Sequence, residues 1–227
     1  MTWKTAYRSF YYEGAPEPED LVLDSATTAL LVIDIQNKYM AVPSSTAEQK
    51  RWAPFFYRMN NIVIPNTCAL IDLFRRHGVE RFFARIACLK ADGRDRSLSQ
   101  KKPGWNYLLM PRTSEESQFV PNLAPRDDEI VLCKTTDSAL TGTNLRLILR
   151  NMNIENVVLA GIFTDQCVSS TVRSLADESF NVVVIEDCCA AGTDELHRRE
   201  LEIINMIYCH VMSSAELKEI MGLGLKS

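Results

Sequence analysis

The sequence lacks the features that would place the protein in a membrane or in a secretory pathway. Its start, from Met1 to Lys4, has no apolar core of a signal peptide. No window approaches the roughly 18 uninterrupted apolar residues that a membrane-crossing helix requires. The net charge of -4 gives no sign of a nucleic-acid or anionic-membrane partner. We therefore expect a cytoplasmic protein with no nucleic-acid and no membrane partner.

Cysteine is present but shows neither a pairing pattern nor a metal-binding pattern. The chain has seven cysteines, an odd number, and most of them lie in apolar runs without any Cys-x-x-Cys or zinc spacing. These features are typical of reduced, mostly buried thiols in a cytosolic protein. Cys188 and Cys189 follow a predicted strand, and we expect them to be packing residues rather than a redox pair.

Predicted strands and helices alternate along the chain, with no internal repeat and no linker. Short apolar runs predict strands at residues 28–36, 81–88, 129–133, 157–160, 181–187 and 209–212. Apolar residues at helical spacing predict helices at residues 55–77, 144–150, 168–178, 193–206 and 214–221. This order predicts a single α/β domain over residues 1–227. Its fold is doubly wound, with a mainly parallel six-stranded sheet and helices on both faces.

Three segments depart from this alternation. Residues 1–25 are irregular and rich in aromatics, and they form either an arm that packs across the domain or a neighbouring subunit, or a loosely ordered tail. Residues 38–54 form a connection long enough for a lid or a substrate wall. Residues 89–128 are the least regular part. Trp105 in this part either lines a pocket or covers the core, and we favour the core.

One strand, turn and helix contain the most informative cysteine. The strand at residues 157–160 ends at Gly161, and Thr164 and Asp165 are both suited to cap the helix that follows. Cys167 then lies in the first turn of a helix at the carboxyl end of a strand, where open α/β sheets bind ligands. Backbone N–H groups and the helix dipole at such a position stabilise a thiolate. The alternative is that Cys167 is one more buried apolar side chain.

Three predicted strands place reactive side chains at their carboxyl ends. Asp34 ends the first strand, Lys134 follows the third, and Cys167 follows the fourth. Because these ends share one edge of a parallel sheet, we expect the three side chains to meet there. A carboxylate, an ammonium group and a thiol suit nucleophilic catalysis on a carbonyl carbon, with Asp34 as the proton acceptor and Lys134 favouring the thiolate.

Three sequence segments resemble the cysteine hydrolases of the isochorismatase-like superfamily. They lie at residues 30–37, 134–145 and 160–173, and the agreement in element order extends from about residue 26 to 221. The resemblance implies that Asp34, Lys134 and Cys167 form a catalytic triad. It also implies a cis peptide bond between Ile162 and Phe163, so that the backbone N–H groups of Phe163 and Cys167 form an oxyanion hole.

The resemblance implies the hydrolysis of a small amide. Cys167 would attack the carbonyl carbon, ammonia, an amine or carbamate would leave, and water would cleave the thioester. The partners expected are therefore a small-molecule amide substrate and further copies of the chain, as a homodimer or homotetramer. No cofactor is expected. Candidate substrate contacts are Gln36, Tyr39, Trp105 and Thr164.

The residues after the second predicted strand bear on the choice among branches of the superfamily. Nicotinamidase-like members bind a metal there through an aspartate and paired histidines, whereas residues 88–95 contain no histidine. The three histidines lie elsewhere, and we expect His77 and His197 to be exposed on helices. A metal site is therefore not expected. Isochorismatases proper lack the catalytic cysteine, so Cys167 argues against that activity.

The resemblance is strongest to biuret and ureidoacrylate amidohydrolases, but several positions leave the substrate open. Departures from the pattern of these enzymes occur at Lys38, Leu140 and residues 207–209. The sequence therefore predicts a metal-independent cysteine amidohydrolase acting on an amide or ureido compound. Two alternatives stay open, which are a catalytically idle binding or scaffold protein of this fold and a nicotinamidase-type amidase.

Overall fold

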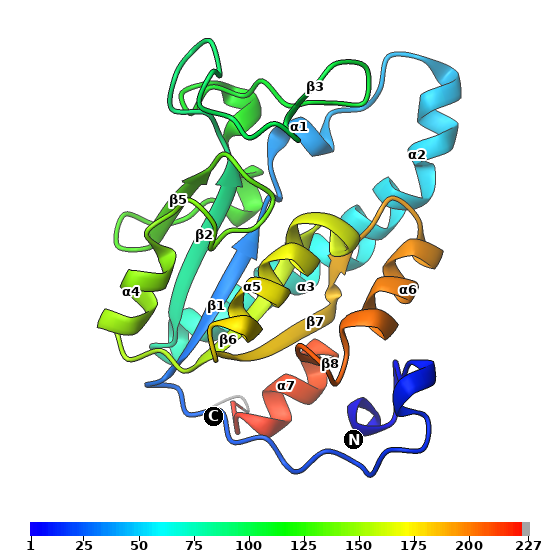
Figure 1. Ribbon diagram of the computed structural model, residues 1–227, viewed down its shortest axis with the longest axis vertical. Helices are drawn as coiled ribbons and strands as arrows, with labels where there is room; N and C mark the ends of the chain where they lie inside the picture. The colour runs from blue at the N-terminus through cyan, green and yellow to red at the C-terminus, as the bar shows by residue number, and fades with distance from the viewer. Residues whose placement is uncertain (224–227) are drawn as a thin grey trace.

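The computed structural model describes residues 1–223 and contains the predicted six-stranded sheet. The last residues of the predicted domain, 224–227, lie outside the described part. The strand order is β5-β2-β1-β6-β7-β8, and every neighbouring pair is parallel. The strands are β1 (Thr28–Ile33), β2 (Glu80–Ile86), β5 (Ile130–Lys134), β6 (Asn156–Ile162), β7 (Asn181–Ala190) and β8 (His210–Met212). The predicted doubly wound α/β fold is thus confirmed (Figure 1).

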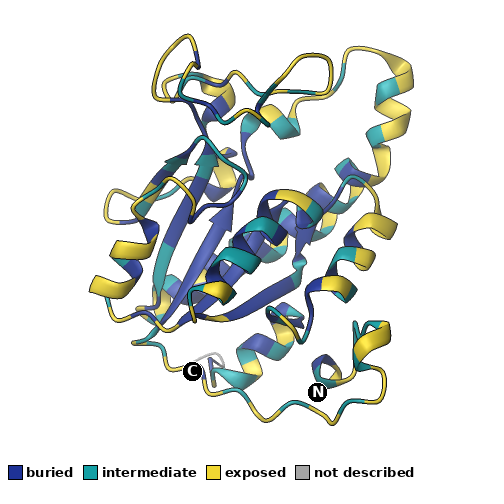
Figure 2. Ribbon diagram, in the orientation of Figure 1, coloured by how far each residue is buried: buried dark blue, intermediate teal, exposed yellow. Residues whose placement is uncertain are grey.

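Helices cover both faces of the sheet, and each face has its own apolar core. One face is covered by α2 (Thr46–Arg58), α3 (Ile64–Arg76) and α7 (Ser214–Ile220). The other face is covered by α4 (Leu145–Asn151), α5 (Ser169–Asp177) and α6 (Asp194–Ile204). Figure 2 shows the buried strands between these two layers, with the exposed residues on the outer sides of the helices. The central strands are apolar throughout because both of their faces are covered.

The segment expected to be a lid or substrate wall is mostly helical. It contains α1 (Asn37–Met40) and the beginning of α2, whose N-terminus is capped by the Ser45 hydroxyl accepting from the Glu48 N–H at 3.2 Å. Only residues 41–45 are irregular, so the expectation of a long loop is wrong. A π-helical turn at Met59–Val63 separates α2 from α3 and interrupts the predicted helix just before Pro65.

The N-terminal arm packs on the last strand and helix of the chain rather than forming a loose tail. Trp3 is buried. Its backbone N–H and the Thr2 hydroxyl both donate to the Glu216 carboxylate on α7. The Asn205 amide donates to the carbonyl oxygens of Ala6 and Tyr7. These contacts attach the start of the arm to the body of the protein.

The irregular region contains only a short hairpin, formed by β3 (Lys101–Lys102) and β4 (Asn106–Tyr107). Trp105 lies between these strands and is 78% exposed. The expectation that it covers the core is therefore wrong, and its exposure gives no support to a pocket role. The hairpin consists of polar and aromatic residues whose side chains have little of the core to pack against.

Gly161 allows β6 to approach β1 closely at the place where the chain leaves β1. Its φ angle is +136°, and a Cβ atom there would lie 2.1 Å from the carbonyl oxygen of Ile33. Any residue larger than glycine would thus force the two central strands apart. The close approach fixes the position of the chain immediately before Asp34.

No helix within residues 1–223 combines the length and the apolar character needed to cross a membrane. All seven cysteines are unpaired, and five of them are buried, including Cys188 and Cys189. The burial agrees with the packing role expected for those two residues.

A buried carboxylate joins the edge strand β5 to the helix layer. Glu129 accepts hydrogen bonds from the guanidinium groups of Arg75 (2.8 Å) and Arg81 (3.0 Å) and from the N–H of Arg126 (2.8 Å). Its side chain has no exposed surface. Burial alone would raise its pKa, but these donors outweigh burial and hold the pKa of Glu129 at about 2.

We predict that Glu129→Gln lowers the free energy of unfolding at neutral pH by about 3 kcal/mol, the scale of breaking a buried ion pair. The wild-type carboxylate stabilises the fold above its ordinary pKa of 4.5, and this stabilisation is lost as the pH falls towards about 2. The difference in the free energy of unfolding between variant and wild type, measured by urea titration, should therefore decrease over that pH range. Glu116→Gln, which breaks an exposed ion pair with Lys38, is the control and should change stability by less than about 0.5 kcal/mol.

Candidate active site

The fold brings the three predicted reactive side chains into contact. The ammonium nitrogen Nζ of Lys134 lies 2.7 Å from Oδ2 of Asp34 and 3.3 Å from Sγ of Cys167. All three residues are buried, with exposed fractions of 1% for Asp34, 0% for Lys134 and 4% for Cys167. The lysine thus lies between a carboxylate and a thiol in a site from which water is largely excluded.

The backbone at the end of β1 directs Asp34 towards this site. Asp34 has a φ angle of +55°, a left-handed conformation that aspartate adopts more readily than most residues. Its Oδ1 accepts a hydrogen bond from the Ile86 N–H at 2.9 Å. Its Oδ2 contacts Lys134 as an ion pair but accepts no well-aligned hydrogen bond, so it retains capacity to take a proton.

Lys134 is held at the end of β5 and also donates to the carbonyl oxygen of Thr136 at 3.2 Å. The ammonium group therefore has three close oxygen or sulfur partners, Asp34, Cys167 and Thr136. Two of these contacts are hydrogen bonds, to Cys167 and Thr136, and the third is the ion pair with Asp34. A charge that is paired and hydrogen-bonded in this way can be fully buried.

Cys167 lies in a π-helical turn, Thr164–Val168, that precedes α5. The Thr171 hydroxyl donates to the Cys167 carbonyl at 2.7 Å and accepts from the Ala139 N–H at 2.9 Å. The turn of the cysteine is thereby joined to the loop after β5. No side chain caps this turn, so the expected capping by Thr164 or Asp165 is wrong.

The peptide bond between Ile162 and Phe163 is cis. Within residues 1–223, the Phe163 N–H donates to no carbonyl or side-chain oxygen. Phe163 directly precedes the turn that carries Cys167. Its N–H is therefore unused at the edge of the site.

The charges of the site favour a neutral thiol in the resting state. Burial, and next the charge of Asp34, raise the pKa of Cys167 well above its ordinary value, although Lys134 lowers it. Burial also raises the pKa of Asp34, against the effect of Lys134, and makes this carboxylate a stronger base than an exposed one. Asp34 and Cys167 raise the pKa of Lys134 against the opposing effect of burial, and keep it charged. Burial and Asp34 thus act against the thiolate that a helix start and Lys134 favour.

The candidate substrate contacts have different environments. Both amide hydrogens of Gln36 are used by the carbonyl oxygens of Ile86 and Ser117, so Gln36 has no donor left for a ligand. The Thr164 hydroxyl oxygen lies 2.7 Å from a histidine nitrogen and is fully buried. Tyr39 is half-buried, and burial, and next the charges of Asp34 and Cys167, raise the pKa of its hydroxyl.

Aromatic side chains pack around the residue that precedes the cysteine turn. The ring of Phe163 lies 5.5 Å from Tyr39, 6.1 Å from Trp52 and 5.2 Å from Phe55, measured between ring centroids. Tyr39 belongs to α1, whereas Trp52 and Phe55 belong to α2. These helices, which replace the expected loop, thus bring Tyr39, Trp52 and Phe55 against Phe163. We refer to these four rings as the aromatic wall.

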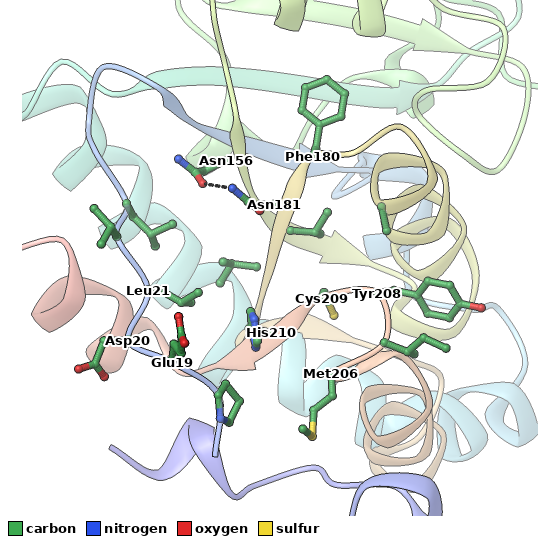
Figure 3. A pocket seen from close by; sticks show the side chains of 17 residues that line it. Glu19, Asp20, Leu21, Asn156, Phe180, Asn181, Met206, Tyr208, Cys209 and His210 are labelled. Carbon is green, nitrogen blue, oxygen red and sulfur yellow. Dashed lines mark hydrogen bonds between the residues drawn. The ribbon is translucent and has the colours of Figure 1, made fainter. Parts of the chain in front are cut away.

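A surface crevice lies at the opposite end of the sheet from the triad. It has a volume of about 440 Å³ and is formed between the arm and the amino ends of β6, β7 and β8, near Asn156, Asn181 and His210 (Figure 3). Four other crevices lie elsewhere on the surface, and none of the five is lined by a triad residue.

The residues after β2 do not fit a metal site. The Asp95 carboxylate accepts hydrogen bonds from the backbone N–H groups of Leu89 and Lys90, at 2.7 and 3.3 Å, and so closes its own loop. Within residues 1–223 no cluster of three or more histidine, cysteine, aspartate or glutamate side chains could hold a metal ion.

Sequence reasoning missed two residues beside the cysteine turn, the buried His197 and the half-buried Arg58. His197 is only 4% exposed, so its expected exposure on a helix is wrong, and its Nδ1 lies 2.7 Å from the Thr164 hydroxyl. Arg58 contacts the other ring nitrogen, Nε2, at 2.8 Å. The helical spacing of His197 with Leu201 and Ile204, which are both buried on α6, was the signal that would have placed it on the inner face.

Comparisons with known proteins agree with this fold. The isochorismatase domain matches residues 28–216, and the chain therefore belongs to the isochorismatase family. It is 29% identical to an uncharacterised isochorismatase family protein of Bacillus subtilis, over 81% of this chain and 88% of the relative. It is 28% identical to a ureidoacrylate amidohydrolase of Methylobacterium radiotolerans, over 90% of this chain and 83% of that enzyme.

Solved structures show the same fold. A cysteine hydrolase from Pseudomonas syringae pv. phaseolicola superimposes with a TM-score of 0.76, covering 92% of this chain and 98% of its own. The sequence identity to that structure is 19%, so the likeness concerns the fold.

We predict that alkylation of Cys167 by iodoacetamide continues to accelerate above pH 9, because only the thiolate reacts and the pKa of Cys167 is raised. The second-order rate constant, followed by mass spectrometry of the peptide, should still increase between about pH 9 and pH 10. The control is Cys167 in the protein unfolded by denaturant. Its rate constant should level off near the ordinary thiol pKa of about 8.5. A native rate constant that levels off at lower pH would contradict the neutral resting thiol.

Proposed function

We propose that this protein is a cysteine amidohydrolase that cleaves a small amide or ureido compound through a thioester at Cys167. The observation that carries the proposal is the contact of Lys134 Nζ with both Asp34 and Cys167 in a buried site. A nucleophile, a base and a cation that orients both are the groups that covalent amide hydrolysis needs. The homologous ureidoacrylate amidohydrolase supports an amide substrate.

The first half of the reaction begins with a proton transfer inside the triad. Asp34 accepts the thiol proton as Sγ of Cys167 bonds to the substrate carbonyl carbon, and Lys134 stabilises the sulfur while it is negative. The carbonyl oxygen becomes an oxyanion, for which the backbone N–H groups of Phe163 and Cys167 are the proposed donors. The carbon–nitrogen bond then breaks, Asp34 returns its proton to the leaving nitrogen, and ammonia or an amine departs.

The second half hydrolyses the thioester. A water molecule attacks the thioester carbon while Asp34 accepts one of its protons. The carbon–sulfur bond breaks, and Cys167 regains its proton from Asp34. A carboxylic or carbamic acid leaves, and the three side chains return to their starting protonation states.

The surroundings support a small and largely uncharged substrate. Tyr39 is the group near the triad whose hydroxyl is available, and the rings of Tyr39, Trp52 and Phe163 in the aromatic wall offer flat apolar surface. An amide or ureido group is planar and polar at its edges, and it would match such a wall by stacking and hydrogen bonding. We propose Tyr39 as a substrate contact, whereas Gln36 serves to hold Ile86 and Ser117.

We predict that Cys167→Ala lowers ammonia release by at least about 10³-fold, because no other group can form the thioester. Activity is measured first on a panel of biuret, ureidoacrylate, N-carbamoyl amino acids, nicotinamide and simple amides. The variants are then compared on the best substrate. Asp34→Asn should cause a loss of similar size, since the amide cannot accept the thiol proton.

Cys68→Ala is the matched control, because Cys68 lies on α3, is half-buried and should leave the rate unchanged. Ammonia release by Cys167→Ala at the wild-type rate would refute the proposal. No release from any compound of the panel by the wild-type protein, together with an unreactive Cys167, would favour a binding or scaffold role.

A further inference from the structure

A line of polar side chains, buried at Thr164 and His197 and half-buried at Arg58, leads from the turn of Cys167 to the opposite helix layer. Arg58 at the end of α2 contacts His197 on α6, with 2.8 Å between Nη2 and Nε2. His197 in turn contacts Thr164, with 2.7 Å between Nδ1 and Oγ1. We refer to these three residues as the Arg58–His197–Thr164 relay. None of them touches the sulfur or carboxylate of the triad in a recorded hydrogen bond or ion pair.

The chemistry of the relay fixes the hydrogen on the histidine ring. A guanidinium group has only donors, so Nε2 of His197 must accept the hydrogen bond from Arg58. The ring nitrogen that remains, Nδ1, must then carry the hydrogen and donate it to the Thr164 hydroxyl oxygen. Thr164 is therefore an acceptor towards His197, and its own hydroxyl hydrogen is free to point elsewhere.

Arg58 is itself held by an irregularity in β7. The pairing of β6 with β7 shifts register between Leu159 and Gly161, which leaves extra residues on β7 without ladder partners. Arg58 donates to two carbonyl oxygens of this bulge, those of Glu186 (2.9 Å) and Cys189 (3.0 Å). The guanidinium group is thus anchored by backbone atoms and is only 14% exposed.

The surroundings of His197 keep the ring neutral. Burial, and next the charge of Arg58, lower the pKa of His197 to about 3. The acidic side chains nearest to Arg58 are Glu186 and Asp194, at 3.6 and 3.7 Å from the guanidinium nitrogens. They partly balance its charge. A second hydrogen on His197 would also have to displace the hydrogen bond from Arg58.

We infer that Arg58 and His197 are positioning residues for the nucleophile, which act by holding Thr164 through a single histidine tautomer. Thr164 is the first residue of the turn that carries Cys167 and directly follows Phe163. Fixing its side chain fixes the direction of the Phe163 N–H and of the thiol. A misplacement of about 1 Å at such a point can cost about 10²-fold in rate. This inference rests on the proposed function of Cys167.

The tautomer is tested directly by ¹⁵N NMR of the wild-type protein labelled at histidine. We expect the His197 signals of a protonated Nδ1 and an unprotonated Nε2, with no change between about pH 5 and pH 9. The spectrum of His197→Asn identifies which of the three histidine signals disappears. A hydrogen on Nε2, or titration of His197 within this range, would overturn the inference.

Two substitutions of His197 test the roles of its two ring nitrogens separately. The amide of His197→Asn can replace Nδ1 as the donor to Thr164, whereas the amide of His197→Gln can replace only Nε2 as the acceptor for Arg58. We predict that the glutamine variant lowers the rate constant for iodoacetamide alkylation of Cys167 by about 10- to 100-fold. The asparagine variant should stay within about threefold of wild type.

Arg198→Gln is the control, because Arg198 is the next residue on α6 and its side chain is 75% exposed. Thermal unfolding midpoints are recorded for all three variants. An equal decrease of the alkylation rate constant in the asparagine and glutamine variants would indicate a structural role only. That result, or no loss in either variant, would overturn the inference.

Hydrogen–deuterium exchange of residues 163–168 separates this inference from the proposed function. If the wild-type protein releases no ammonia from the panel and Cys167 is not alkylated, the proposed function fails, but the exchange rates still test the relay. We expect faster exchange in His197→Gln than in wild type, and no change in His197→Asn. Identical exchange in all three proteins would show that the relay does not hold the turn.

Discussion

The buried ammonium group of Lys134 is the constraint on which the site depends. A charge without exposed surface is tolerated only beside a partner, and Asp34 supplies that partner at 2.7 Å. The two residues lie on strands that are separated by β2, which pairs with both of them. Ile86 of β2 lies opposite Lys134 in the ladder and donates its N–H to Asp34. The register of three strands is thus set by the same contacts that form the triad.

The sequence was sufficient to predict the sheet and the meeting of the three reactive side chains. Continuous apolar runs identify central strands, and the carboxyl ends of parallel strands must share one edge. The helical structure within residues 37–54 was missed because the first turns of α2 are polar and exposed. Their apolar contacts, such as Phe55 against Phe163, come from a segment more than 100 residues away, which no local pattern reveals.

The charge state of the cysteine was the part of the site that sequence could not provide. A helix start and a nearby lysine both favour a thiolate, and this was the basis of the expectation. The opposing effect is burial, which depends on how closely the aromatic wall and the loops cover Cys167. The same reasoning applies to His197, whose environment is decided by the packing of α6 against the cysteine turn. Burial is a property of the assembled layers, and it acts against the local argument for a thiolate.

A neutral resting thiol is compatible with catalysis because the proton moves only within the triad. Before the transfer the site holds one carboxylate, one ammonium group and one thiol, and after it one carboxylic acid, one ammonium group and one thiolate. The net charge of the buried site is the same in both states, so the transfer does not add an uncompensated charge to a low-dielectric region. Lys134 contacts both possible anions and can stabilise either of them. The raised pKa of Cys167 thus keeps the thiol protonated before a substrate binds. The raised pKa of Asp34, which is equally buried, lowers the free-energy cost of the proton transfer when a carbonyl carbon is in place.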